Sequence, residues 1–166
     1  MAYLKMMNES YFNSNAVENV VHYITGHSLC TGSATTSIVP DECIFQMYTI
    51  KAVYGKMSGR QIRHFILAFN SAYECITMEE LQQLGAQIAS YYDKTYQVIW
   101  AIHISKNNHW HLHFAMNTVS YMDGRMYREG YGDLINLGTF ISAILPDGVE
   151  PLKFGYGKSY EAEIDF

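Results

Sequence analysis

The clearest pattern of apolar and polar positions lies in residues 109–114, HWHLHF, where three histidines alternate with three large apolar residues. Because successive side chains of a strand point to opposite faces, this spacing predicts a strand with one apolar face and one face of imidazoles. Residues 96–105 predict the preceding strand, and the turn residues 106–108 predict that the two strands form an antiparallel hairpin. His103 then shares the face of the later histidines.

Helices are predicted where apolar residues recur at spacings of three and four. The strongest such segment is 78–92, which a capping box of Thr77 and Glu80 precedes. The remaining pattern predicts helices over 16–24, 40–54 and 133–145, strands over 2–7 and 62–69, a Ser/Thr/Gly-rich loop over 27–39, and a Gly/Tyr-rich tail after the last helix.

This order of elements predicts one α+β domain over residues 1–166. We expect an antiparallel β-sheet with helices packed on one face, because Trp110, Leu112 and Phe114 need an apolar partner. The face that bears the histidines is expected to stay open.

Composition narrows the class of protein. Hydrophobic residues make up 49% of the 166 residues and charged residues 16%, which is typical of a globular chain. The net charge of −5 counts against a nucleic-acid partner without excluding one. Three widely spaced cysteines favour reduced thiols, and no apolar run reaches the length of a membrane span. These features predict a cytoplasmic protein.

Three facing imidazoles suggest a metal site, because imidazole nitrogen is a good ligand for divalent transition ions. A site of three histidines keeps positions open for a substrate, as catalytic metal sites do. Asn117 lies on the same predicted face and is a candidate to hold an imidazole tautomer. The alternative is a row of histidines on an exposed sheet face that binds nothing.

Four segments together resemble the plasmid mobilisation relaxases of the MobA/VirD2-like group, which are HUH endonucleases. They are VVHYITG (20–26), IRHFILAF (62–69), ITMEELQQLGAQIA (76–89) and YQVIWAIHISKNNHWHLHFAMNTV (96–119), and the tail PLKFGYGKSY (151–160) adds to the likeness. The resemblance covers the catalytic core and implies an HUH/RRM-like fold.

The resemblance implies that Tyr23 attacks a phosphate of single-stranded DNA at an origin of transfer and forms a phosphotyrosine. It also implies that His103, His111 and His113 hold a divalent metal ion, which would be Mn, Mg, Zn, Ni or Co. The implied partners are single-stranded DNA and accessory mobilisation proteins, and the implied setting is the bacterial cytoplasm. Tyr11, which precedes the first helix, is the rival nucleophile.

Further polar residues are candidates for supporting roles. His109 is expected to support the metal ligands or to contact DNA, and Glu74 to orient an imidazole. The candidates for phosphate contacts are the basic residues Arg60, Arg63, Lys106, Arg125 and Arg128; solvated surface charge is the alternative for each.

Two other functions stay open. A related HUH enzyme, either a rolling-circle replication initiator or a transposase, would place its catalytic tyrosine after the histidine strand. Tyrosines at that place in the chain are Tyr121, Tyr127, Tyr131 and Tyr156. The acidic charge also allows a non-catalytic domain that binds metal or DNA.

Overall fold

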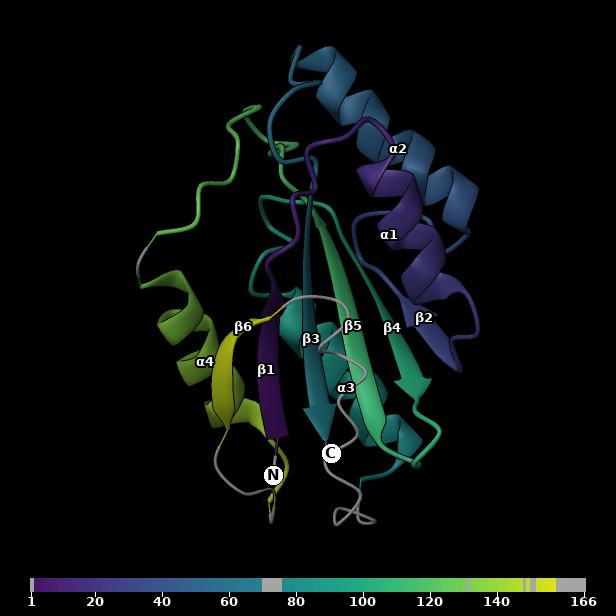
Figure 1. Ribbon diagram of the computed structural model, residues 1–166, viewed down its shortest axis with the longest axis vertical. Coiled ribbons are helices and arrows are strands. Elements are labelled where there is room, and N and C mark those ends of the chain that lie inside the picture. The colour runs from purple at the N-terminus through teal and green to yellow at the C-terminus, as the bar shows by residue number, and fades with distance from the viewer. Residues whose placement is uncertain (1, 70–75, 131, 148, 150–151, 158–166) are drawn as a thin grey trace.

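The computed structural model describes residues 2–69, 76–130, 132–147, 149 and 152–157. Within them, six strands form one sheet, and four helices pack around it (Figure 1). The strands are β1 (Ala2–Met7), β2 (Cys30–Gly32), β3 (Ile62–Phe69), β4 (Val98–Ile104), β5 (Trp110–Asn117) and β6 (Lys153–Gly157). The helices are α1 (Ala16–Thr25), α2 (Pro40–Val53), α3 (Met78–Ala89) and α4 (Asp133–Ile144).

The sheet has the strand order β2-β4-β5-β3-β1-β6. Its neighbours pair antiparallel except for β1 and β6, which run parallel. The predicted α+β class and the hairpin of β4 and β5 are confirmed, and β6 makes the sheet mixed. Asn108 closes the hairpin turn with a φ of 62°, a conformation that asparagine tolerates better than most residues.

One face of the sheet packs on α3 and α4. Apolar side chains from β1, β3, β4 and β5 meet the buried stripe of α3, and the predicted capping box at Thr77 and Glu80 is present at its start. Close packing between α3 and the sheet requires a glycine at position 85, because a Cβ on Gly85 would lie 2.8 Å from the ring of Trp100. This side carries the larger apolar core.

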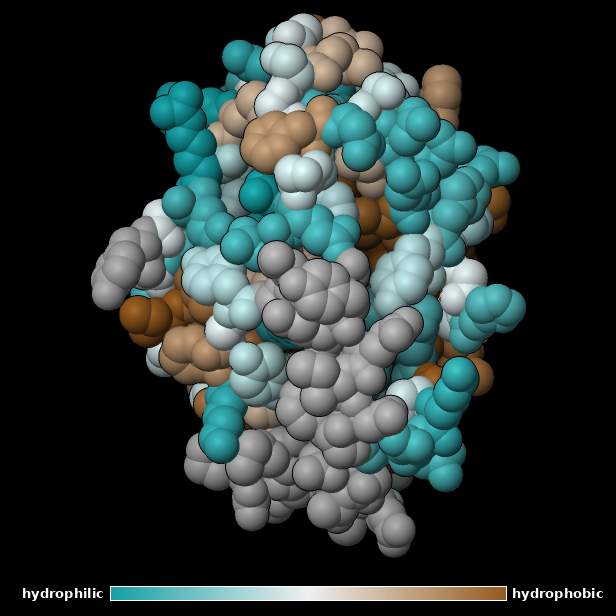
Figure 2. Space-filling view, in the orientation of Figure 1, coloured by the Kyte–Doolittle hydropathy of each residue, from teal (hydrophilic) through white to brown (hydrophobic). Residues whose placement is uncertain are grey.

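The other face, which bears the histidines, is partly covered by α1 and α2 (Figure 1). The prediction that helices pack on only one face therefore missed the layer that α1 and α2 form on the other face. The sheet itself is open. The apolar stripe of α1 is buried against the small or apolar side chains Ile99, Ala101 and Ala115 of the sheet. The stripe consists of Val17, Val20, Val21 and Ile24. Hydrophilic side chains gather over the outer side of α1 (Figure 2).

Two strands were not predicted, and one helix ends more than two residues before its predicted end. β2 lies in the predicted loop, because it is a three-residue edge strand that depends on pairing with β4. β6 lies in the predicted tail and depends on β1 in the same way. α3 ends at Ala89, and turns follow it. Among the described helices, none is both long and apolar enough to cross a membrane.

Candidate active site

The register of the two hairpin strands brings the predicted histidines together. His103 of β4 lies directly opposite His111 of β5, and His113 lies two pairs further along, opposite Ala101. The ring centroid of His113 is 4.5 Å from that of His103 and 6.1 Å from that of His111. The predicted convergence of these three imidazoles is therefore present.

A fourth histidine, which the sequence pattern did not single out as a site residue, completes this histidine cluster. His64 comes from β3, which pairs with the other edge of β5. Its Nε2 lies 3.3 Å from Nδ1 of His113, and the two rings are stacked with centroids 5.6 Å apart. His64 shares a face of its strand with Ile62 and Ile66, whose side chains pack on the α1 side. The sequence offers no signal for this face, because every position of β3 is buried.

Tyr23 stands over the histidine cluster. The buried stripe of α1 packs down on the sheet, and Tyr23 lies beside that stripe, 57% exposed. Its ring centroid is 5.6 Å from His113, 5.9 Å from His64 and 6.4 Å from His103. An accessible phenol therefore lies next to three imidazoles that come from three different strands.

Tyr11, the alternative nucleophile, contacts the same histidine cluster from its buried side. It is only 7% exposed, and its hydroxyl lies 3.2 Å from Nδ1 of His64. Burial, followed by the nearby carboxylate of Glu9, raises the pKa of Tyr11 above its usual range. A buried phenol that resists deprotonation is a poorer nucleophile than the exposed Tyr23.

α1 also orients one imidazole through its backbone. Nε2 of His103 lies 2.5 Å from the carbonyl oxygen of Ile24, in the last turn of the helix. A carbonyl oxygen only accepts, so Nε2 of His103 carries the proton and Nδ1 keeps its lone pair. The contact also ties α1 to β4 close to Tyr23.

Burial keeps the cluster neutral. Desolvation lowers the pKa of His64 to about 3 and that of His111 to about 4, and neighbouring imidazoles add to both shifts. The same causes hold the pKa of His113 well below its usual range, and burial lowers that of His103. Neutral imidazoles present lone pairs, which is the form that binds a metal ion.

The donor chemistry fits a divalent ion. Among the described residues, no three His, Cys, Asp or Glu side chains are arranged as a finished metal site. The cluster nevertheless offers neutral nitrogen donors, with one lone pair of His103 left uncommitted by its bond to Ile24. Such donors suit Mn, Co, Ni or Zn better than Mg, which prefers oxygen.

The side chain of Asn117 is fully buried at the far end of β5. Its Nδ2 donates to the carbonyl of Met47 at 3.1 Å and to Oε1 of Gln97 at 2.9 Å, and its Oδ1 accepts from the amide of Val119 at 3.2 Å. None of these partners within the described residues is a histidine. The bonds fix α2 on the sheet, and Asn117 does not hold an imidazole as predicted.

His109 lies just before β5 and is buried. Its backbone amide donates to Oγ of Ser105 at 3.1 Å, and its carbonyl accepts from the amide of Ser105 at 2.9 Å, which closes the hairpin turn. Its charge, when present, lowers the pKa of His111. These bonds place His109 at the hairpin turn, and its predicted supporting role stays a prediction.

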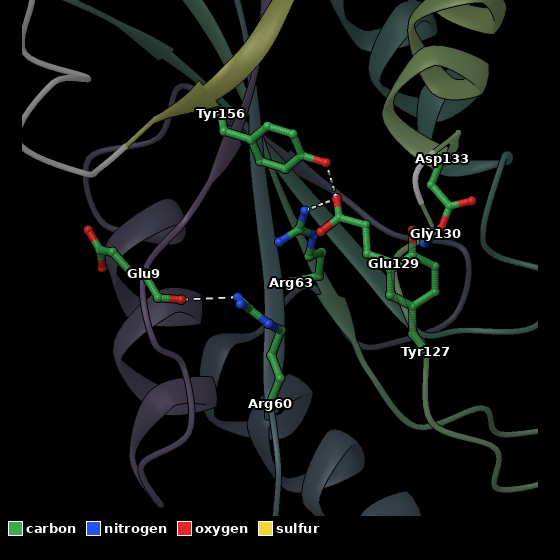
Figure 3. Close-up of polar contacts among 8 residues, drawn as sticks. All are labelled: Glu9, Arg60, Arg63, Tyr127, Glu129, Gly130, Asp133 and Tyr156. Carbon is green, nitrogen blue, oxygen red and sulfur yellow. Dashed lines mark hydrogen bonds and ion pairs between the residues drawn. The ribbon is translucent and has the colours of Figure 1, made fainter.

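Arg63 points away from the histidines. It follows Ile62 in β3, so its side chain lies on the α4 side of the sheet, where it is 2% exposed and pairs with Glu129 (Figure 3). The hydroxyl of Tyr156 donates to the same carboxylate at 3.4 Å. Arg63 and His64 thus lie on opposite faces, and Arg63 does not join the site.

The remaining predicted residues lie at the periphery. Arg60 donates from Nη1 to the carbonyl of Glu9 at 3.0 Å (Figure 3). Its guanidinium also lies 5.5 Å from the ring centroid of Phe12. Lys106 is exposed in the hairpin turn, and Arg128 is exposed after β5. Arg125 is exposed beside Asp123, at 3.4 Å. Glu74 lies outside the described residues.

Comparison with known families gives one match. The model of the family described as the nuclease domain of MobA/VirD2-like relaxases matches residues 6–145. The matched span begins near the end of β1 and ends just after α4, so it includes Tyr23 and all four histidines of the cluster. No curated protein and no solved structure gave a significant match.

Proposed function

We propose that this chain, which belongs to the MobA/VirD2-like relaxase nuclease family, cuts and rejoins one strand of DNA at an origin of transfer through Tyr23. Family membership gives the coarse activity, that of a DNA-nicking relaxase domain. The observation that supports the finer proposal is the position of Tyr23, an exposed phenol whose ring centroid lies 5.6 Å from that of His113.

In the proposed step, the phenol oxygen of Tyr23 attacks the phosphorus of a phosphodiester in single-stranded DNA. The new bond joins the tyrosine to the 5′ phosphate, and the bond to the 3′ oxygen breaks, so a strand with a free 3′ hydroxyl leaves. The phenol proton passes to solvent or to the departing oxygen. Because one phosphoester replaces another, the step is reversible and the strand can be rejoined.

Charge builds on the phosphate oxygens during such a transfer and must be neutralised. His103, His111 and His113 are the residues that would hold a divalent ion for this purpose. When bound, the ion supplies positive charge beside the phosphate and draws electron density from it. Tyr23 contributes an accessible oxygen, and its contacts with His64 and His113 limit where its ring can lie.

The tyrosines that would serve a replication initiator lie elsewhere. The hydroxyl of Tyr121 bonds to the carbonyl of Asp93, that of Tyr127 to Asp133, and that of Tyr156 to Glu129. Tyr131 lies outside the described residues. None of the three described tyrosines contacts the histidine cluster, so their positions favour the relaxase arrangement.

Trapping of a covalent complex tests the proposal. The purified protein is incubated with Mn²⁺ and a pool of labelled single-stranded oligonucleotides, and denaturing electrophoresis detects protein that carries DNA. Tandem mass spectrometry of the digested adduct then identifies the modified residue. We expect a nucleotide on Tyr23. A nucleotide on Tyr121 or Tyr156 would contradict the proposal and indicate the replication-initiator arrangement.

A further inference from the structure

A continuous hydrogen-bonded chain runs under Tyr23 from the β1–α1 connection to the centre of the sheet. The hydroxyl of Tyr11 lies 3.2 Å from Nδ1 of His64, and Nε2 of His64 lies 3.3 Å from Nδ1 of His113. All three side chains are buried. Water therefore does not compete for the atoms of these two contacts, and both nitrogens of His64 and Nδ1 of His113 are paired within the chain.

Each link of this chain can be polarised in two ways, because an imidazole nitrogen either donates or accepts. In one direction, Tyr11 donates to His64, His64 donates to His113, and Nδ1 of His113 only accepts. The proton of His113 would then sit on Nε2, and no lone pair would remain for a metal ion. In the other direction, His113 donates to His64, His64 donates to Tyr11, and Nε2 of His113 stays free.

Only the second direction leaves His113 a lone pair at Nε2, so the proposed metal site requires it. Tyr11 lies beside the carboxylate of Glu9, and both the charge of Glu9 and its hydrogen bonding with the phenol add to burial in raising the pKa of Tyr11. The hydroxyl of Tyr11 can accept as well as donate, so its oxygen can take the N–H of His64 at Nδ1.

The position of Glu9 is itself held by the backbone. Its carbonyl accepts from Nη1 of Arg60 and from the amide of Tyr11, both at 3.0 Å. The carbonyl of Tyr11 accepts from the amide of Gln61 at 2.7 Å, which fixes the segment beside the start of β3. The backbone of Glu9 and Tyr11 is therefore placed by Arg60 and Gln61, which immediately precede the strand that supplies His64.

We infer that Glu9, Tyr11 and His64 are positioning residues that hold His113 with its proton on Nδ1, so that Nε2 faces a divalent ion. This inference rests on the proposed function, since it concerns the metal site of that reaction. It gives the buried phenol and the fourth histidine a role in orienting a ligand. His103 is oriented separately, through the carbonyl of Ile24.

The first test needs no activity and no variant. Long-range correlation NMR of ¹⁵N-labelled histidine distinguishes the two imidazole tautomers in the metal-free protein. We expect His113 to carry its proton on Nδ1 and His64 to do the same. A proton on Nε2 of His113 in the wild-type protein would overturn the inference, whatever the protein does to DNA.

The second test uses Tyr11→Phe, which removes the hydroxyl and keeps the ring. We expect the tautomer signals of His64 and His113 to become mixed, and the affinity for Mn²⁺ in calorimetric titration to fall about 10–100-fold, as loss of a residue that orients a metal ligand typically does. Tyr48→Phe is the matched control, because its hydroxyl bonds to the carbonyl of Ser14 and not to a histidine. Unchanged tautomers and unchanged Mn²⁺ affinity in Tyr11→Phe would overturn the inference.

Tyr23→Phe separates this inference from the proposed function. Its loss of the covalent adduct, with His113 tautomer and Mn²⁺ affinity as in the wild type, agrees with both. A wild-type protein that shows the expected tautomer and binds Mn²⁺, but forms no adduct with DNA, contradicts the proposed function and leaves the positioning role of Tyr11 supported.

Discussion

The rings of Tyr23 and His113 meet in a T-shaped arrangement, with centroids 5.6 Å apart and planes at 81°. Tyr23 comes from α1, and His113 comes from the middle of the sheet. Their contact exists because the apolar stripe of α1 packs on the small residues Ala101 and Ala115 next to the histidines. The accessible phenol of Tyr23 thereby lies next to a histidine cluster that is otherwise largely closed to solvent.

Replacement of Tyr23 by Phe removes the oxygen that the proposed reaction needs. We expect no covalent adduct with single-stranded DNA from Tyr23→Phe, while its thermal unfolding stays close to that of the wild type because the exposed hydroxyl contributes little to packing. Tyr91→Phe is the control, since Tyr91 is also exposed and packs against Phe140 on the other side of the sheet. Adduct formation by Tyr23→Phe at the wild-type rate would rule out the assigned nucleophile.

Removal of a proposed metal ligand should weaken Mn²⁺ binding by more than the roughly 10–100-fold typical of supporting residues. His111→Ala tests this, because His111 is only partly buried and leaves a smaller gap than His113 would. The measurement is calorimetric titration of the purified variant with Mn²⁺. His22→Ala serves as the control, since His22 is exposed on α1 beside Asp41.

The same experiment has a functional arm. Chelation of divalent ions with EDTA should abolish the DNA adduct of the wild-type protein, and added Mn²⁺ should restore it. Equal Mn²⁺ affinity in His111→Ala and wild type would exclude His111 as a ligand.

Glu129 is the charge partner of the buried Arg63, so Glu129→Gln leaves a cation without compensation on the α4 side of the sheet. Loss of one partner of a fully buried pair costs about 3–5 kcal/mol. Because the side chain of Glu129 is 24% exposed, we expect the free energy of unfolding to fall by a smaller amount, about 2 kcal/mol. Urea unfolding measures the change.

Asp123→Asn is the matched control for this ion pair. Its partner Arg125 is 87% exposed, and water screens exposed pairs so strongly that they contribute little to stability. Equal losses of stability in the two variants would contradict the distinction between the buried and the exposed pair.

The buried histidines make the metal-free protein sensitive to acid. The pKa is lowered to about 3 for His64 and to about 4 for His111. In the unfolded chain both lie near 6.5, so the unfolded state binds more protons between these values and stability rises with pH. We expect the full stability above about pH 6.5 and a loss below it, with a slope of at most about 1.4 kcal/mol per pH unit for each histidine.

Urea unfolding in EDTA at a series of pH values from about 7 down to about 5 checks this slope, which lies within the window set by the two pKa shifts. His64→Gln should show a shallower dependence, because one of the two titrating rings is gone. A metal-free protein that gains stability on acidification in this range would contradict the buried, neutral state of the cluster.

The local sequence pattern predicted the part of the site that lies on one hairpin. Strict alternation in β5 determines which of its side chains share a face, and the short turn sets the register with β4. The amino-acid sequence alone therefore sufficed to place His103 and the later histidines on one face, and His103 lies opposite His111. The role of Tyr23 came from the family resemblance, since nothing in the pattern of α1 marks it.

The parts that depend on distant pairing could not be predicted in the same way. β3 is buried at every position, so its pattern does not reveal which face meets the site. For that reason Arg63 was counted among the candidates for phosphate contacts, and His64 was not counted among the site residues. Their faces follow from the pairing of β3 with β5, which lies about 50 residues further along the chain. The short β2 likewise depends on β4 and carries too few residues to show a period.

The parallel pairing of β6 with β1 has a consequence for any shortened form of this protein. The residues that the family model matches end at 145, before β6 begins, yet β6 covers the outer edge of β1, and its Phe154 packs close to Gly138 of α4. A chain cut after residue 145 would leave unpaired the amide and carbonyl groups on the outer edge of β1, the edge that does not pair with β3. Uncovered strands of this kind recruit other chains, so self-association and aggregation would follow from that truncation even with every residue of the histidine cluster in place.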